Sequence, residues 1–121
     1  MKPEQFIREY GPKFVNELPE SATHVSGFTG QVYKDSGNNI YVWDGVNWHK
    51  SIYRHTRGMI PVSRLKQLAE SLDLVESKNG INEAKEILRL VRLHSSSLSP
   101  ESKRLAQAIR DHESIYGGGD E

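Results

Sequence analysis

The 121-residue chain contains 16 Lys and Arg against 16 Asp and Glu, so its formal net charge is zero, and it has no cysteine. A dedicated DNA-binding domain usually carries a basic excess and a DNA mimic an acidic one, so a nucleic-acid role would have to come from a local patch. The lack of cysteine excludes disulfides, thiolate metal sites and thiol nucleophiles.

The segment 3–18 is expected to be helical, because its apolar residues recur at spacings of three and four and form one stripe. Pro3 suits the first turn of a helix, and Glu4 favours the positive end of the helix dipole. Gly11-Pro12 interrupts the pattern, because proline removes an amide donor and disfavours helix at the residue before it. We therefore expect a kink or two short helices here.

Residues 22–52 have the composition of strands and turns, with β-branched and aromatic residues separated by glycines. We expect an antiparallel meander of three strands, with residues 23–26 as a fourth. The turn at 35–39 leaves the register open by one residue, and such a slip would turn the first strand over.

The strongest hairpin signal is the Asp-Gly pair at 44–45, which favours a two-residue turn. This turn would place Trp43 opposite Val46 and Tyr41 opposite Trp48, with all four on one face. We expect the rings to pack beneath the N-terminal helix and form the chain's only core.

Three helices are expected after a connector at 53–60, over residues 61–78, 82–93 and 100–116. Asn79-Gly80 is expected to end the first, with the glycine as its left-handed cap. Ser99 before Pro100 is a strong helix start, because serine caps the free amides of a first turn.

The predicted fold class is therefore α+β: an N-terminal kinked helix, a three- to four-stranded antiparallel meander, then three C-terminal helices. A chain of this length fits one domain, expected over residues 1–116, and the glycine-rich residues 117–121 are expected to be a disordered tail. The N-terminus lacks an apolar signal segment, and no run approaches the ~20 apolar residues of a membrane span. We expect a cytoplasmic protein with no membrane contact.

The aromatic face of the hairpin is the first candidate site. Tyr41, Trp43 and Trp48 could stack on bases, on sugars or on a partner's side chain. The alternative, which we favour at this point, is that the three rings fill the core.

The second candidate is the basic segment 49–57, which holds Lys50, Arg54 and Arg57 together with Tyr53 and contains no acid. Phosphate or an acidic protein surface could bind such a segment. The alternative is a solvated strand end whose charges pair elsewhere.

The third candidate is a stripe of Lys85, Arg89 and Arg92, which the spacing i, i+4, i+7 places on one side of a helix. The stripe could extend the basic segment into a patch that binds a partner or phosphate. The alternative is the solvated side of an amphipathic helix.

No catalytic or metal-binding pattern is present in the sequence. The five histidines are not spaced as metal ligands, and nucleophile, phosphate-loop and dinucleotide motifs are missing. We therefore expect no metal, no cofactor and no enzymatic activity. A deep pocket that combines His24, His49 or His55 with a carboxylate would argue for an enzyme.

Four segments together carry a resemblance to a known group of proteins, and they span residues 4–11, 19–24, 41–48 and 74–85. The chain resembles, over residues 3–90, small accessory proteins encoded by temperate lambda-like tailed phages and prophages. The resemblance implies a host-directed or replication-related accessory role in a bacterial cell, and it carries over no catalytic residues.

Two functional hypotheses follow. The first is a non-enzymatic, phage-encoded protein that binds and modulates a host protein or complex, with the helix 100–116 as the expected docking element. The second is a weak nucleic-acid-binding module that uses the basic segment 49–57 and the aromatic hairpin.

Overall fold

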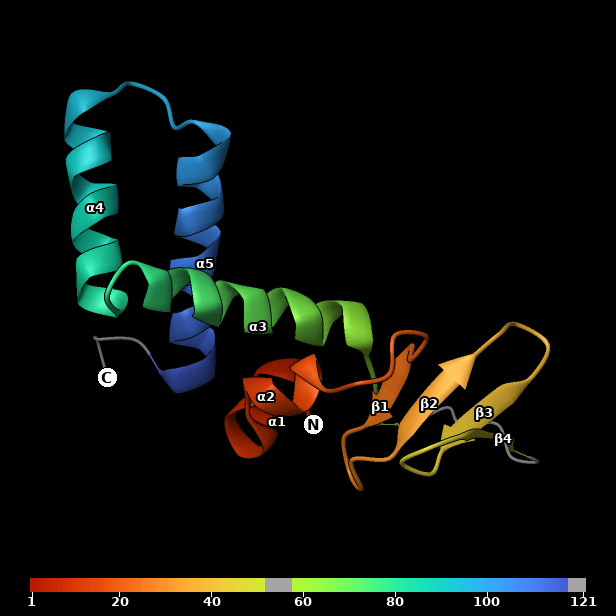
Figure 1. Ribbon diagram of the computed structural model, residues 1–121. Coiled ribbons are helices and arrows are strands. Elements are labelled where there is room, and N and C mark those ends of the chain that lie inside the picture. The colour runs from red at the N-terminus through yellow and green to blue at the C-terminus, as the bar shows by residue number, and fades with distance from the viewer. Residues whose placement is uncertain (52–57, 118–121) are drawn as a thin grey trace. The chain divides into compact units, whose positions relative to one another are not determined.

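The computed structural model describes residues 1–51 and 58–117, and it confirms the α+β class (Figure 1). Helices come first, then an antiparallel sheet, then three more helices. By its internal contacts the chain divides into two compact units, Met1–Lys66 and Gln67–Glu121, and each is described by itself. The single domain expected over residues 1–116 stays a prediction, and the tail at 118–121 lies outside the described residues.

The N-terminal segment forms two short helices, α1 (Pro3–Tyr10) and α2 (Pro12–Asn16). Gly11 separates them with φ of 86°, a value that glycine adopts without strain. The ring of Phe6 stacks on Tyr10 with centroids 4.3 Å apart and meets Phe14 edge-on at 5.5 Å. The expected interruption at Gly11-Pro12 is therefore confirmed as a break between two helices.

The sheet of the first unit has five strands in the order β4-β3-β2-β1-β5. They are β1 (His24–Ser26), β2 (Val32–Asp35), β3 (Ile40–Trp43), β4 (Trp48–Lys50) and β5 (Met59–Pro61). The first four form the expected meander, and β5 pairs antiparallel with β1.

The strand β5 was not expected, because residues 53–60 were predicted as a connector and Pro61 as the start of a helix. The strand is only three residues long and has no alternating pattern, so its pairing with β1 decides its structure rather than its own sequence.

The register of the β3–β4 hairpin differs from the predicted one. Trp43 lies opposite Trp48, and Tyr41 lies opposite Lys50. The turn is centred one residue later than expected, because Asp44 accepts hydrogen bonds from the amides of Val46 (2.7 Å) and Asn47 (2.6 Å) and closes the turn around Gly45. The shift of the pairing is two residues, so Tyr41, Trp43 and Trp48 still share a face, whereas Val46 stands in the turn with 75% of its surface exposed.

The core of the first unit lies under β1, β2 and β5 and not under the hairpin. Val25 pairs with Val32 on one side and with Ile60 on the other, and all three are buried. Tyr41, Trp43 and Trp48 are only half-buried. The prediction that these rings form the core beneath the N-terminal helix is therefore wrong. The buried residues lie on β1, β2 and β5, and the strands that carry the rings, β3 and β4, form the opposite end of the sheet.

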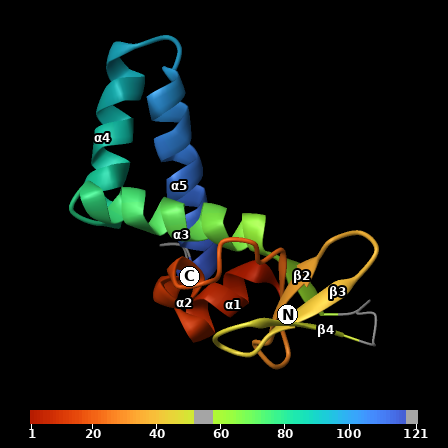
Figure 2. The same cartoon turned by 45° about the vertical axis from the view of Figure 1, so that its right-hand side comes forward.

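The second unit contains the C-terminal part of α3 (Val62–Ser77) together with α4 (Ile81–His94) and α5 (Pro100–Tyr116). The three predicted helices are confirmed: the bounds of α3 and α4 differ from the prediction by one residue at each end, and those of α5 agree with it. Figure 2 shows α4 and α5 side by side, as does Figure 1. Their buried side chains form a core with the end of α3: Val75, Ala84, Leu88, Leu105, Ala106, Ala108 and Ile109. The expectation of only one core is therefore wrong.

The helix α5 is a structural part of this core. Leu105, Ala108, Ile109 and Ile115 are among its buried residues. The apolar side of α5 is therefore covered within the unit, and the expectation that α5 is the docking element stays a prediction that only its exposed polar side could fulfil.

A buried polar network joins α3 to α5 inside the second unit. Ser71 and Asp111 are 0% and 2% exposed, and the Ser71 hydroxyl donates to the Asp111 carboxylate at 2.6 Å. The Gln107 amide donates to the other carboxylate oxygen at 2.9 Å, and the Arg104 guanidinium donates to the Ser71 hydroxyl at 3.1 Å. Buried polar groups are tolerated only when they are paired, so this network fixes how the two helices meet.

Candidate functional site

The basic stripe of α4 borders a hollow in the second unit. Lys85, Arg89 and Arg92 line a cavity of about 380 Å³ together with Leu88, Leu93, Ile109 and Glu113. The structure therefore brings these three predicted residues together on one side of α4, next to apolar side chains.

Two of the three cations are already paired. Lys85 Nζ lies 3.7 Å from a carboxylate oxygen of Glu113, and Arg89 binds Glu86 with its Nε 3.0 Å from one carboxylate oxygen. The Arg89–Glu86 hydrogen bonds lower the pKa of Glu86 and raise that of Arg89. Within the described ranges Arg92 has no ion pair, so its charge is the one left for a ligand.

His112 adds no charge to this side of the unit at neutral pH. Burial lowers the pKa of the His112 imidazole below its ordinary value, and the nearby charge of Lys85 lowers it further. A histidine with a lowered pKa is neutral at pH 7.

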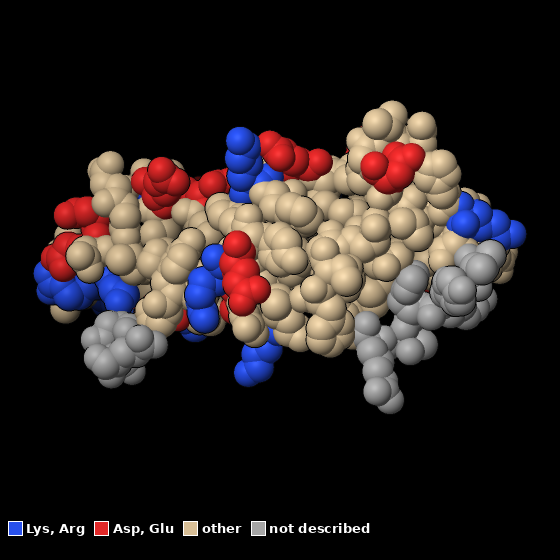
Figure 3. All heavy atoms as spheres, turned by 90° about the horizontal axis from the view of Figure 1, so that it is seen from below, with Lys and Arg blue, Asp and Glu red and all other residues tan. Residues whose placement is uncertain are grey.

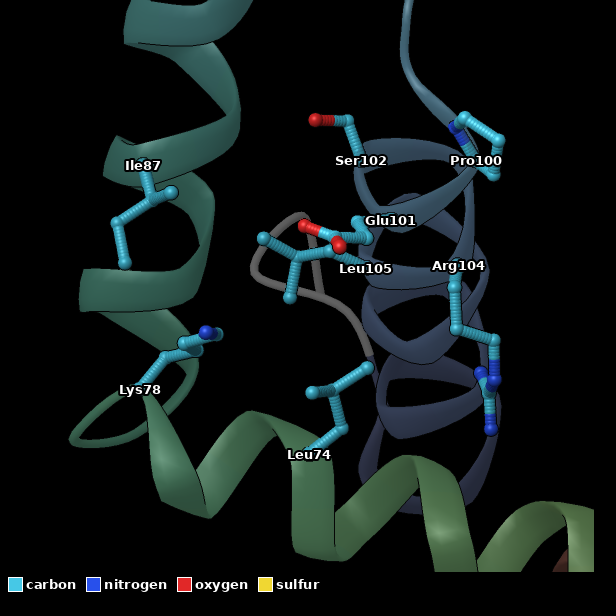
Figure 4. Close-up of a pocket in the computed structure, with 8 residues that line it drawn as sticks. All are labelled: Leu74, Lys78, Ile87, Pro100, Glu101, Ser102, Arg104 and Leu105. Carbon is cyan, nitrogen blue, oxygen red and sulfur yellow. The ribbon is translucent and has the colours of Figure 1, made fainter.

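A larger hollow of about 590 Å³ opens between α4 and α5 above the end of α3. In the close-up of Figure 4, Ile87, Leu105 and Leu74 come from three different helices and surround the opening. Ser102 lies at its upper edge, Glu101 lies beside Leu105, and Lys78 lies at the α4 side between Ile87 and Leu74, while Arg104 points away from α4 (Figure 4). The hollow thus has apolar walls and a polar rim, as small apolar binding sites do.

Three large apolar residues on α4 are exposed to solvent: Ile87 at 37%, Leu90 at 43% and Leu93 at 64%. Their spacing of three residues keeps them within one side of the helix. Ile87 lines the larger hollow and Leu93 lines the smaller one, so the three residues run from one hollow to the other. We call Ile87, Leu90 and Leu93 the α4 ridge.

In the first unit, five residues of β2, β3 and β4 share one face of the sheet. Lys34 pairs with Tyr41, Tyr41 with Lys50, and Trp43 with Trp48. The Lys34 ammonium lies 4.8 Å from the centroid of the Tyr41 ring and 5.0 Å from that of Trp48. We call Lys34, Tyr41, Trp43, Trp48 and Lys50 the ring face.

Most of the predicted basic segment 49–57 lies outside the described residues, including Tyr53, Arg54 and Arg57. Of its described members, Lys50 is exposed and belongs to the ring face. His49 lies on the opposite face of β4, with its Nε2 2.5 Å from a carboxylate oxygen of Asp44.

Of the three histidines that the sequence offered for a catalytic pocket, His24 and His49 are described, whereas His55 lies outside the described residues. His24 lines a hollow of about 70 Å³ together with Tyr33 and Asp35. That volume is about that of two water molecules, which is too small for an organic substrate. His49 and Asp44 stand on an exposed turn, with 63% and 44% of their side chains accessible.

Among residues 1–51 and 58–117, no three His, Asp or Glu side chains are grouped as metal ligands. Over the same part of the chain, no helix combines the length and the apolar character that crossing a membrane requires. In Figure 3, the Lys and Arg side chains at the left and in the middle of the view stand near Asp and Glu, whereas the Lys and Arg group at the right-hand end has no Asp or Glu next to it.

Lys34, the exposed Leu90 and the pair Ser71–Asp111 were not predicted as functional or buried polar residues from the sequence. Lys34 joins the rings only through the observed strand register, which the sequence left open. A signal for Leu90 was present, because α4 carries apolar residues on more sides than a single core-facing stripe needs. A buried pair of a serine and an aspartate has no such signal in one sequence.

Comparison with known proteins adds no relative. No family model matches the chain, and no curated protein or solved structure is significantly similar to it.

Proposed function

We propose that the chain is a non-enzymatic protein-binding accessory protein and that its partner docks on the α4 ridge. The observation that carries the proposal is the exposure of Ile87, Leu90 and Leu93 between two hollows of the second unit. Contiguous exposed apolar side chains with a polar rim are typical of protein interaction surfaces.

The hollows determine what kind of segment fits. A partner helix that lies along the ridge can insert apolar side chains on both sides of α4, as helices bound in grooves do. The larger hollow would take the principal anchor, because its walls are Leu74, Ile87 and Leu105. Anchors buried in such pockets usually supply most of the binding energy.

The charges suggest an acidic partner segment. Lys85, Arg89 and Arg92 border the smaller hollow, and Arg92 has no ion pair within the described part of the chain. A carboxylate beside the partner's apolar anchors would pair with Arg92 and speed the encounter. We therefore propose an amphipathic, acidic helix of a host protein as the occupant. That the partner is a host protein, and that binding modulates it, rests on the resemblance to phage accessory proteins.

The test places a photo-crosslinking amino acid at position 90 of the tagged chain in bacterial cells. We expect one stoichiometric crosslinked protein, which is lost when Leu93 is changed to Glu in the same chain. The matched control carries the crosslinker at position 46, since Val46 is also an exposed apolar residue but lies in the first unit. Equal crosslinking from both positions, or no loss with Leu93→Glu, would overturn the proposal.

A second copy of the chain is the alternative occupant of the ridge. Light scattering of the purified protein distinguishes the two. A dimer that becomes a monomer with Leu90→Glu would show that the ridge serves self-association, and the host-protein proposal would then fail.

A further inference from the structure

The ring face differs chemically from the rest of the sheet. Trp43 and Trp48 meet across two strands with centroids 5.1 Å apart, and both rings are half-buried. They continue the same face as the buried Val25 and Val32, because the residues of paired strands alternate between two faces. The core side of the sheet therefore extends beyond the core as a surface of aromatic rings that solvent still reaches.

The charges on this face are all positive. Lys34 and Lys50 both pair with Tyr41, one from each neighbouring strand. The two acids next to these strands in the sequence lie away from the ring face. Asp35 follows Lys34 on β2 and therefore points to the opposite face, and Asp44 contacts His49, which also lies on the opposite face. From residue 45 to residue 69 the sequence contains no Asp or Glu at all.

We propose that the ring face is a second binding site and that it takes single-stranded nucleic acid. Unpaired bases stack on exposed aromatic rings, and each stacked base contributes about 1–3 kcal/mol. Lys34 is held on the rings by cation–π attraction and Lys50 is exposed, so both ammonium groups lie where phosphates beside stacked bases would pass. A duplex hides its base faces and could use only the two lysines, so single strands bind more tightly.

This site is independent of the α4 ridge. The ring face belongs to the first unit, and Ile87, Leu90 and Leu93 belong to the second. A variant such as Leu90→Glu should leave nucleic-acid binding unchanged, so the failure of one proposal does not affect the other.

The chain's own fluorescence provides the test, because its two tryptophans are Trp43 and Trp48. We expect oligo-dT or oligo-rU of roughly ten nucleotides, a length within the range that small single-strand-binding folds cover, to quench this fluorescence at low salt. Affinity should fall linearly with salt on logarithmic axes. Binding of either oligomer supports the proposal, and the tighter one identifies the sugar that the site prefers.

Two lysine variants and one control localise the site. Lys50→Gln should weaken binding several-fold and reduce the salt slope by about 1, as loss of one phosphate contact does. Lys34→Gln should do the same, and because Lys50 is exposed, Lys50→Gln remains informative if Lys34→Gln loosens the hairpin. Lys103→Gln, on exposed α5 surface of the second unit, removes the same charge and should change neither quantity.

Four results would overturn the proposal. They are an absence of quenching at low salt, a duplex that binds as tightly as the single strand, a Lys50→Gln variant that binds like the parent, and an acidic peptide that binds more tightly than the oligonucleotides. The last result would identify the ring face as a protein-binding surface.

Discussion

Trp43 and Trp48 lie directly opposite each other on β3 and β4, with ring centroids 5.1 Å apart and ring planes inclined by 57°. Tilted aromatic pairs at this distance attract each other beyond the area they bury. The pairing depends on a turn that begins immediately after Trp43 and ends immediately before Trp48, so the conformation of four residues controls the geometry of both rings.

We predict that Gly45→Ala destabilises the protein by about 1 kcal/mol, the typical cost of forcing an L-residue to a positive φ. Gly45 has φ of 105°, and a Cβ atom built on it would meet nothing within 4 Å, so the cost comes from the backbone alone. Urea unfolding followed by tryptophan fluorescence measures this loss of stability, because both tryptophans of the chain flank the turn. Val46→Ala, in the same turn, is the control and should change little. If Gly45→Ala were as stable as the parent, the positive φ at position 45 would cost an alanine nothing, which would contradict the prediction.

We predict that Asp44 makes the hairpin sensitive to acid. Hydrogen bonds from the amides of Asn47 and Val46, then from His49, lower the pKa of Asp44 to about 2 from an ordinary 3.8. Because the folded pKa lies below the unfolded one, the carboxylate stabilises the fold above about pH 4, and this contribution is lost as the pH falls from 4 towards 2.

Unfolding midpoints in urea at pH 4.5 and pH 2.5 test this expectation. The parent should lose more stability between the two values than Asp44→Asn, whose amide oxygen accepts the same backbone hydrogen bonds but does not titrate. The same loss in both proteins would show that other carboxylates cause the acid sensitivity.

We predict that Asp111→Ala destabilises the second unit by about 3 kcal/mol, because it leaves the buried hydroxyl of Ser71 and the amide of Gln107 without their acceptor. Ser71→Ala should cost less, about 1 kcal/mol, since Asp111 keeps its bond from Gln107. Helical circular dichroism during urea unfolding measures both changes. Glu70→Ala, an exposed acid on α3, is the control and should stay within about 0.5 kcal/mol of the parent. A loss with Asp111→Ala no larger than that of Glu70→Ala would contradict the prediction.

The helices of the second unit could be predicted from the sequence because local signals mark their ends. Ser99 accepts a hydrogen bond from the amide of Ser102 at 3.2 Å, as expected of a serine before Pro100 at a helix start. The apolar spacing around Leu88 and Leu105 placed both residues correctly in a core. Such signals lie within one or two turns of the residues they govern, so one sequence contains them completely.

The sheet was predicted less well because its details depend on residues far apart in the chain. The strand β5 exists through pairing of Ile60 with Val25, which no local pattern indicates. The turn was predicted incorrectly, but Tyr41, Trp43 and Trp48 still share a face. The strand pairing shifted by two residues, and side chains along a strand alternate between two faces, so an even shift leaves each side chain on its predicted face. Lys34 could not be assigned to the rings until the register was known, and burial of the tryptophans could not be judged without the order of the strands.

The junction between α3 and α4 gives the last prediction. The amide of Gly80 donates to the carbonyl of Val75 at 3.1 Å, and that of Asn79 donates to Glu76 at 2.9 Å. Two hydrogen bonds of this kind close the C-terminus of a helix when the first residue after the helix cap is left-handed. Here that residue is Asn79, with φ of 69°. Gly80, which the sequence predicts as the left-handed cap, instead immediately precedes α4.

We therefore predict opposite effects for two substitutions of the same residue. Asn79→Ala should destabilise the protein by about 1 kcal/mol, because alanine tolerates positive φ less well than asparagine. Asn79→Gly should leave stability unchanged or raise it by a few tenths of a kcal/mol, since glycine adopts this conformation without a steric penalty and its greater freedom in the unfolded chain offsets part of the gain. Thermal unfolding of the three proteins at one pH gives the comparison. If alanine were tolerated as well as glycine, the left-handed conformation of Asn79 would not be what closes α3, and the turn into α4 would have to be held by the packing of Ile81 and Ala84 alone.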